Sequence, residues 1–137
     1  MKILILIPIF NDWESLKKLL FELDKIIKNI KEVSIECFVV NDASTISQPK
    51  ITKPENINSL KILHMKENRG HARCNAFGIR YIEKNEKFDY LILMDGDGED
   101  RPEEIKDLIN KIISEPKNSV VAKRIKRSEG LFFKSLY

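Results

Sequence analysis

Cysteine, glycine and proline are scarce in this sequence, and it contains no long hydrophobic run. Its only two cysteines, Cys37 and Cys74, form neither a Cys-x-x-Cys pair nor a cluster with histidine. A disulfide framework and a zinc site are therefore not expected, and a reducing compartment fits best. The five glycines and five prolines exclude a collagen-like or low-complexity chain. The apolar stretch 3–7 is too short for a membrane span and lacks a signal-peptide cleavage site, so we interpret it as a buried strand.

Several familiar motifs are also absent. The sequence has no P-loop and no G-x-G-x-x-G, which counts against NTPases and dinucleotide oxidoreductases. It has no G-x-S-x-G elbow, and neither cysteine is flanked by catalytic partners, which disfavours covalent hydrolysis. Aromatic residues are not interleaved with the basic ones, so the sequence gives little support to nucleic-acid binding.

Length and charge favour one domain with a basic end. The chain has 137 residues, of which 42% are hydrophobic, and its net charge is +3. Residues 117–137 contain six Lys/Arg and one Glu, a net of +5, which leaves −2 for residues 1–116. Such an end favours a phosphate-bearing ligand, an anionic membrane surface or a solvated tail.

Hydrophobic periodicity predicts alternating strands and helices. Asn11 and Glu14 form a capping-box pattern that opens an amphipathic helix. Strands are predicted at 2–9, 34–40, 60–65, 88–94 and 119–122, and helices at 11–30, 70–84 and from Pro102 onward. This order predicts an α/β fold, a mostly parallel sheet with helices on both faces.

Ligands of such sheets bind beyond the carboxyl ends of the strands. Four polar segments follow predicted strands and are the candidate site: 8–12, 41–45, 68–73 and 95–101. We expect the function to reside in these segments.

The most informative segment is acidic. Asp95, Asp97 and Glu99 alternate after a buried strand, and an extended turn would aim them at one hard cation, Mg²⁺ or Mn²⁺. Gly96 would let a ligand approach the backbone. The alternative is an acidic loop stabilised by the dipole of the next helix. An EF-hand is excluded, because its sixth and twelfth positions hold Asp100 and Lys106.

Two other segments leave alternatives open. Asp42 can accept a hydrogen bond from a base or ribose, or it can cap its own turn with Ser44. Arg69 and Arg73 flank a helix start, where they either help to bind an anion or are surface charges.

Together, the ordered segments resemble the family 2 glycosyltransferases, which have the Rossmann-like GT-A nucleotide-diphospho-sugar transferase fold. Residues 5–11 resemble that family's first strand and nucleotide-contacting turn, and residues 39–45 resemble its second motif. Residues 68–78 are similar to its third motif. Residues 94–104 resemble the D-x-D segment of dolichyl-phosphate mannosyltransferase-like members, and residues 120–124 resemble the following strand, whose arginine approaches the donor phosphates.

The resemblance implies a set of roles. The substrate-binding residues would be Pro8, Phe10, Asn11, Asp42, Ser44, Arg69, Gly70, Asp95 and Gly96. Asp95, Asp97 and Glu99 would hold Mg²⁺ or Mn²⁺, and Asp97 and Arg124 would be catalytic. Residue 41 departs from the family pattern, since Asn41 stands where relatives often carry a first aspartate.

The implied activity is inverting transfer of a sugar from a nucleotide-diphosphate donor to a saccharide or polyprenyl-phosphate acceptor. Because the family's catalytic domain is usually longer, residues 1–137 are expected to form a single truncated domain, the donor-binding part without its acceptor half. A cytoplasmic location in cell-envelope polysaccharide biosynthesis is expected, with peripheral membrane contact through the basic end. The alternatives are a non-catalytic nucleotide-sugar binding module and, with less support, a nucleotidyltransferase, whose Gly/Arg-rich loop is missing from residues 8–12.

Overall fold

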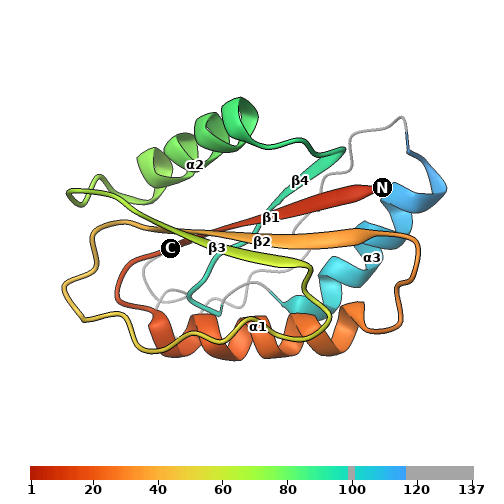
Figure 1. Ribbon diagram of the computed structural model, residues 1–137, viewed down its shortest axis with the longest axis horizontal. Helices are drawn as coiled ribbons and strands as arrows, with labels where there is room; N and C mark the ends of the chain where they lie inside the picture. Colours follow the sequence, from red (N-terminus) through yellow and green to blue (C-terminus); the bar gives the residue numbers. More distant parts are fainter. Residues whose placement is uncertain (99–100, 117–137) are drawn as a thin grey trace, which may run out of the picture. The chain divides into compact units, whose positions relative to one another are not determined.

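The fold is a small parallel sheet with flanking helices, seen in a computed structural model that describes residues 1–98 and 101–116 (Figure 1). Residues 1–106 form one compact unit, and residues 107–116, the end of the last helix, belong to a second. The strands are β1 (Lys2–Ile9), β2 (Ser34–Asn41), β3 (Ser59–His64) and β4 (Tyr90–Leu93), and the helices are α1 (Trp13–Ile27), α2 (His71–Asn85) and α3 (Pro102–Ser114).

The four strands are all parallel and lie in the order β3-β2-β1-β4. In β1 every residue from Ile3 to Ile9 is buried, because this strand has a neighbour on each side and a covered surface on each face. The chain runs from β1 outward to β3 and then returns to the other side of β1 as β4. The predicted α/β class is confirmed, and the carboxyl ends of β1 and β4 lie at a topological switch point.

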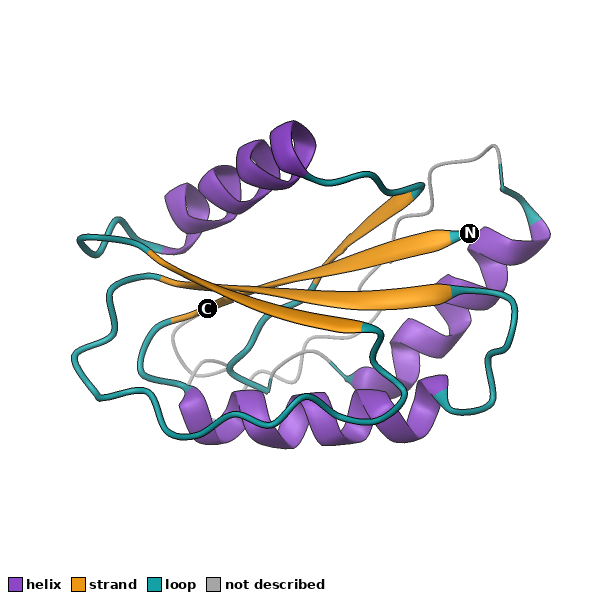
Figure 2. Cartoon of the chain, viewed as in Figure 1, coloured by secondary structure: helices purple, strands orange, loops and turns teal. Residues whose placement is uncertain are grey.

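Helices α1 and α2 lie on opposite faces of the sheet (Figure 2). The face toward α2 buries a cluster of Leu4, Leu6, Phe38, Val40, Cys74 and Ile82. Gly78 allows α2 to pack closely there, because a Cβ at this position would lie 2.7 Å from Leu6 Cδ1 and would displace that side chain. Since strand side chains alternate between faces, Ile3, Ile5 and Ile7 fill the opposite face.

The first helix differs from its predicted bounds. It begins at Trp13 with Asp12 as N-cap, and no side chain caps it, so the predicted capping box is wrong. Asn11 has a φ of 63° and its side chain bonds to Thr45 and Ile46 instead. The helix ends at Ile27 rather than near residue 30.

Strand β1 has its predicted bounds, and the bounds of β2, β3 and β4 differ from the predicted ones by one or two residues. Strand β4 is shorter than predicted, Tyr90–Leu93 instead of 88–94, although the backbone bonds Asp89 N–H to Lys2 O and Met94 N–H to Leu6 O extend the pairing at both ends. The strand predicted at 119–122 lies outside the described residues.

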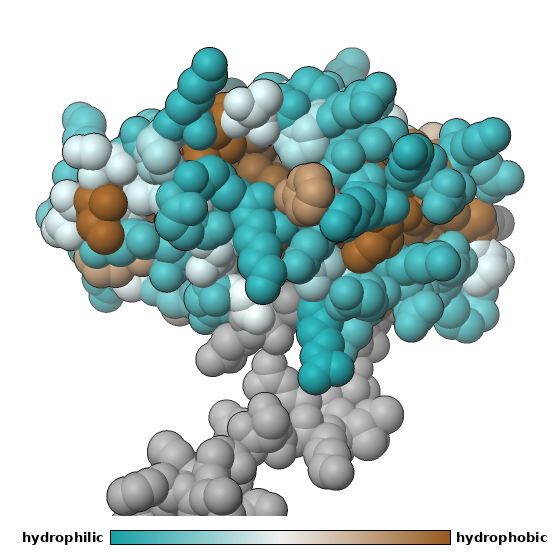
Figure 3. Space-filling view, turned by 90° about the horizontal axis from the view of Figure 1, so that it is seen from below, coloured by the Kyte–Doolittle hydropathy of each residue, from teal (hydrophilic) through white to brown (hydrophobic). Residues whose placement is uncertain are grey.

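The surface seen from below the view of Figure 1 is mostly hydrophilic, with smaller hydrophobic patches between the polar side chains (Figure 3). Scattered exposed apolar side chains of this kind are normal for a folded domain. Among the residues that the structure describes, no helix has both the length and the apolar character needed to cross a membrane.

Candidate nucleotide-binding site

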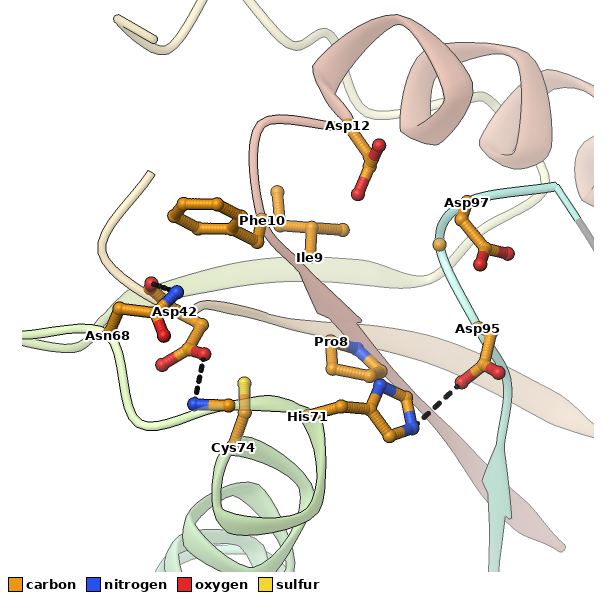
Figure 4. Close-up of a pocket in the computed structure, with 12 residues that line it drawn as sticks. Pro8, Ile9, Phe10, Asp12, Asp42, Asn68, His71, Cys74, Asp95 and Asp97 are labelled. Carbon is orange, nitrogen blue, oxygen red and sulfur yellow. Dashed lines mark hydrogen bonds and ion pairs between the residues drawn. The ribbon is translucent and has the colours of Figure 1, made fainter. Parts of the chain in front are cut away.

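A pocket of about 200 Å³ opens at the carboxyl ends of the strands (Figure 4). Its lining includes residues from all four polar segments that the sequence singled out. The residues that line the pocket are Pro8, Ile9, Phe10, Asp12, Asp42, Asn68, Gly70, His71, Cys74, Asp95, Gly96 and Asp97. The pocket therefore lies where the strand order predicts a ligand site, at the switch point between β1 and β4.

Asp42 holds the loop that leads into α2. Its carboxylate is buried and accepts two backbone bonds, from Arg69 N–H to Oδ1 and from Gly70 N–H to Oδ2, each 2.8 Å long. The Asn68 side-chain amide donates to the Asp42 carbonyl at 3.2 Å. Both carboxylate oxygens thus have a partner within the chain. Asp42 does not cap its own turn with Ser44, so that local interpretation is wrong.

Asn41 caps that turn instead. Its Oδ1 accepts bonds from the backbone N–H of Ser44 at 2.9 Å and from the Ser44 hydroxyl at 2.5 Å. Its Nδ2 lies 3.0 Å from Nδ1 of His64, on the neighbouring strand. The departure from the family pattern at residue 41 therefore has a structural role, because a neutral amide can serve the turn and the next strand together.

Asn11 and Ser44 lie beside the pocket rather than in its lining. The Asn11 N–H donates to the Ser44 hydroxyl at 2.8 Å, and Asn11 Oδ1 accepts from the backbone N–H of Thr45 at 2.8 Å and of Ile46 at 3.0 Å. Trp13 Nε1 donates to the Ile46 carbonyl at 3.0 Å. These bonds join the loops after β1 and β2. Asn11 and Ser44 therefore stabilise the wall of the pocket.

The acidic segment reaches the pocket through Asp95 and Asp97. Gly96 between them packs on the end of β1, and a Cβ there would lie 2.5 Å from Ile9 Cγ2 and 2.9 Å from the Pro8 carbonyl. This glycine is therefore needed for close approach of the protein's own backbone. Glu99 lies outside the described residues, as does Arg124.

Arg69 contributes its backbone rather than its charge. Its guanidinium is paired with Glu67, and its side chain is absent from the pocket lining, whereas its N–H binds Asp42. Gly70 does line the pocket; it is the N-cap of α2, with a φ of 83° that favours glycine.

Five lining residues were not among the predicted site residues: Ile9, Asp12, Asn68, His71 and Cys74. All of them except Cys74 lie in the four polar segments that follow predicted strands. Their place in these segments is the sequence feature that could have identified them as site residues. Burial, with a smaller contribution from Asp42, raises the pKa of the Cys74 thiol to about 12. The thiol is therefore neutral near pH 7.

The pocket is strongly acidic. Four carboxylates line it, Asp12, Asp42, Asp95 and Asp97, and His71 is the one basic side chain among the described lining residues. Within the described part of the chain, no group of three or more His, Cys, Asp or Glu side chains is arranged to hold a metal ion. A phosphate entering this pocket would be repelled unless a cation accompanied it.

Comparison with known proteins finds proteins that this chain matches over part of their length. The uncharacterized protein MJ0544 of Methanocaldococcus jannaschii is 27% identical over 111 residues, covering 78% of this chain and 45% of that protein. The crystal structure of S. aureus TarS matches with a TM-score of 0.63 and 23% identity, over 83% of this chain and 20% of TarS. The structure of TarS 1–349 in complex with UDP-GlcNAc matches with a TM-score of 0.63 and 20% identity, over 93% and 38%.

These structural matches establish the fold, and the chain spans less than half the length of each of these proteins. The family model for glycosyl transferase family 2 matches residues 4–137, nearly the whole sequence. The resemblance noted in the motifs is therefore confirmed at the level of the family. The chain belongs to glycosyl transferase family 2.

Proposed function

We propose that this chain binds the nucleotide-diphosphate-sugar donor of a glycosyltransferase in the acidic pocket. The observation that carries the proposal is the convergence of all four motif segments at the switch point of the sheet. Membership of glycosyl transferase family 2 and the likeness to TarS, whose structure was solved with UDP-GlcNAc, support it.

A divalent cation, Mg²⁺ or Mn²⁺, is proposed to enter with the donor. The chemistry of the pocket fits it, because Asp95 and Asp97 offer hard oxygen donors at one wall. Mg²⁺ is commonly bound by one or two carboxylates together with substrate phosphates, so a preassembled group of three side chains is not required. When bound, the cation would neutralise charge on the departing nucleoside diphosphate. Glu99 as a further ligand and Arg124 as a phosphate partner stay predictions.

The chain's own residues would position the nucleotide. Phe10 leaves 42% of its surface exposed at the pocket and presents a ring on which a base can stack. Asp42 keeps Gly70 and the start of α2 in place through its two backbone bonds. Pro8 and Gly96 form the floor where β1 meets the acidic segment.

Further predictions concern the acceptor, the stereochemistry of the transfer and the place where it occurs. A saccharide or polyprenyl-phosphate acceptor, inversion at the anomeric carbon, a dolichyl-phosphate mannosyltransferase-like specificity and action at the cytoplasmic membrane face stay predictions. A binding module without transfer is the alternative, since the matched proteins extend well beyond the length of this chain. Sugar transfer or donor hydrolysis above background separates the two.

Calorimetric titration tests the proposal. UDP, GDP and CDP are titrated in turn into the purified chain with Mn²⁺, with Mg²⁺ and with a chelator. We expect one nucleotide to bind selectively, and only with a cation. Equal binding in chelator would contradict the metal-dependent part, and no nucleotide binding by the folded chain would contradict the proposal as a whole.

A further inference from the structure

The outer side of α2 carries basic side chains around an exposed aromatic ring. The helix packs on the sheet through Cys74, Gly78 and Ile82, which are buried, so its opposite side is directed away from the strands (Figure 1). Residues spaced by four, three and four positions lie along one side of a helix. Four exposed residues with this spacing form what we call the α2 stripe: Arg73, Phe77, Arg80 and Lys84.

Phe77 presents apolar surface that the chain itself leaves in contact with water. This residue is 39% exposed. Its ring centroid lies 6.4 Å from that of Tyr81, and the Tyr81 ring lies 5.5 Å from that of Phe38 in the core. The Phe77 ring is therefore supported on one side by another aromatic ring. Transfer of its exposed part from water into an apolar layer would be favourable.

The three cations of the α2 stripe form no ion pair with any residue that the structure describes. Other exposed cations, such as Lys61, Arg69 and Lys111, each pair with a carboxylate. Glu83 is the single acidic residue of α2, and at 3.6 residues per turn it lies about 90° around the helix from the stripe. The stripe therefore presents three positive charges to a partner with no carboxylate between them.

An anionic lipid surface matches this combination of charge and apolar surface. Basic side chains are attracted to anionic headgroups, while an aromatic ring between them enters the boundary between headgroups and acyl chains. The long stems of arginine and lysine let the charged ends stay at the headgroups when the ring lies deeper. A single-stranded nucleic acid would need several rings on which successive bases stack, whereas the stripe has one.

We infer that the α2 stripe docks this protein on an anionic lipid bilayer. Arg73 lies within one helical turn of Gly70 and His71, which line the pocket. Docking would therefore hold the rim of the pocket beside the headgroups, where the predicted polyprenyl-phosphate acceptor would be presented. The inference goes beyond the proposed function, and it assigns membrane contact to a described helix in addition to the basic end at residues 117–137.

Tryptophan substitutions test which face of the protein meets the lipid. Phe77→Trp places an indole in the α2 stripe. Phe21→Trp is the matched control on α1, which lies on the opposite face of the sheet, because Phe21 is 59% exposed and Lys25 lies over its ring (Figure 2). The native Trp13 is buried and present in both variants, so a difference between them belongs to the new indole.

The two tryptophan variants are mixed with vesicles of phosphatidylcholine that contain phosphatidylglycerol. We expect the emission of Phe77→Trp to shift to shorter wavelength, because its indole enters the apolar layer, and that of Phe21→Trp to stay unchanged. Vesicles of phosphatidylcholine alone should shift neither, since they lack the negative charge.

Sedimentation with the same anionic vesicles measures the contribution of the charges. The α2 triple variant carries Arg73→Gln, Arg80→Gln and Lys84→Gln. The control triple variant carries Lys18→Gln, Lys25→Gln and Lys28→Gln, on α1. Both are made in the full chain, both lower its net charge by three, and both should stay folded because all six side chains are exposed. One cation near an anionic surface strengthens binding about fivefold. The α2 triple variant should therefore bind at least about tenfold more weakly than the control.

Each contrary result would overturn the inference. Equal losses in the two triple variants would show that net charge rather than α2 drives binding. A wavelength shift at residue 21 instead of residue 77, or no binding of the wild type to anionic vesicles, would exclude docking through α2. Retention on heparin without vesicle binding would assign the stripe to a soluble polyanion instead. These measurements use neither nucleotide nor metal, so their failure is distinct from failure of the proposed function, which calorimetry tests.

Discussion

Replacing Asp42 by alanine should loosen the loop before α2 and, with it, the pocket. The buried carboxylate accepts two backbone bonds, from Arg69 and from Gly70. Hydrogen bonds to charged groups contribute about 1.5–3 kcal/mol each, and a donor left unsatisfied in a buried position costs a similar amount. Because Arg69 is exposed and water can reach part of this loop, we expect a loss of about 2–4 kcal/mol in the free energy of unfolding.

Asp42→Asn tests the same contact more gently. The asparagine keeps one acceptor oxygen, but its amide nitrogen would face the N–H of either Arg69 or Gly70. We therefore expect a loss between zero and that of Asp42→Ala. Urea denaturation followed by the fluorescence of Trp13, the single and buried tryptophan, measures each value.

Asp24 provides a matched control for Asp42. It accepts bonds from the Asn56 backbone N–H at 2.6 Å and from the Asn56 side chain at 2.9 Å, but it does not line the pocket. Asp24→Ala should lower stability and leave nucleotide affinity unchanged, whereas Asp42→Ala should weaken nucleotide binding at least tenfold. Wild-type stability in Asp42→Ala, or an equal loss of affinity in Asp24→Ala, would show that the Asp42 carboxylate does not hold the pocket loop in place.

Two further predictions concern Gly96 and the thiol of Cys37. Gly96→Ala forces a Cβ within 2.5 Å of Ile9 Cγ2, so it should cost about 1–3 kcal/mol of stability and abolish metal-dependent nucleotide binding; calorimetry that finds unchanged affinity would contradict this. Burial raises the pKa of Cys37 from 9.0 to about 12. The unfolded chain therefore loses this proton at a lower pH than the folded chain does, and the unfolding free energy should fall as pH rises above 9.0. Urea denaturation across that pH should show a smaller fall in Cys37→Ala, and an equal fall in both would contradict the assignment.

The sequence predicted the sheet because its central strand carries an unmistakable pattern. A run that is apolar at every position from Ile3 to Ile7 suits a parallel strand covered on both faces, and β1 is that strand. The candidate site followed from the same topology, since polar segments after parallel strands gather at one edge. These inferences need only local pattern and chain order.

The sequence could not predict contacts made across long separations. Asn11 has the local pattern of a capping box with Glu14, yet its side chain finds partners at Thr45 and Ile46, more than thirty residues away. A left-handed φ of 63° turns it out of the helix start and makes those bonds available. The approach of His71 to Asp95 likewise depends on α2 beginning, and β4 ending, beside the same strand.

Metal-dependent nucleotide binding by Asp97→Asn is the decisive test of donor binding in the acidic pocket. Asp97 lines the pocket, and the substitution keeps its shape while removing its charge. Asp107→Asn, at an exposed position of α3, is the matched control. Each variant is titrated by calorimetry with the nucleotide that the wild type prefers, with Mn²⁺ and with chelator. We expect Asp97→Asn to stay folded and to lose metal-dependent binding while Asp107→Asn keeps it. Unchanged metal-dependent affinity in Asp97→Asn would exclude Asp97 as a residue that holds the cation.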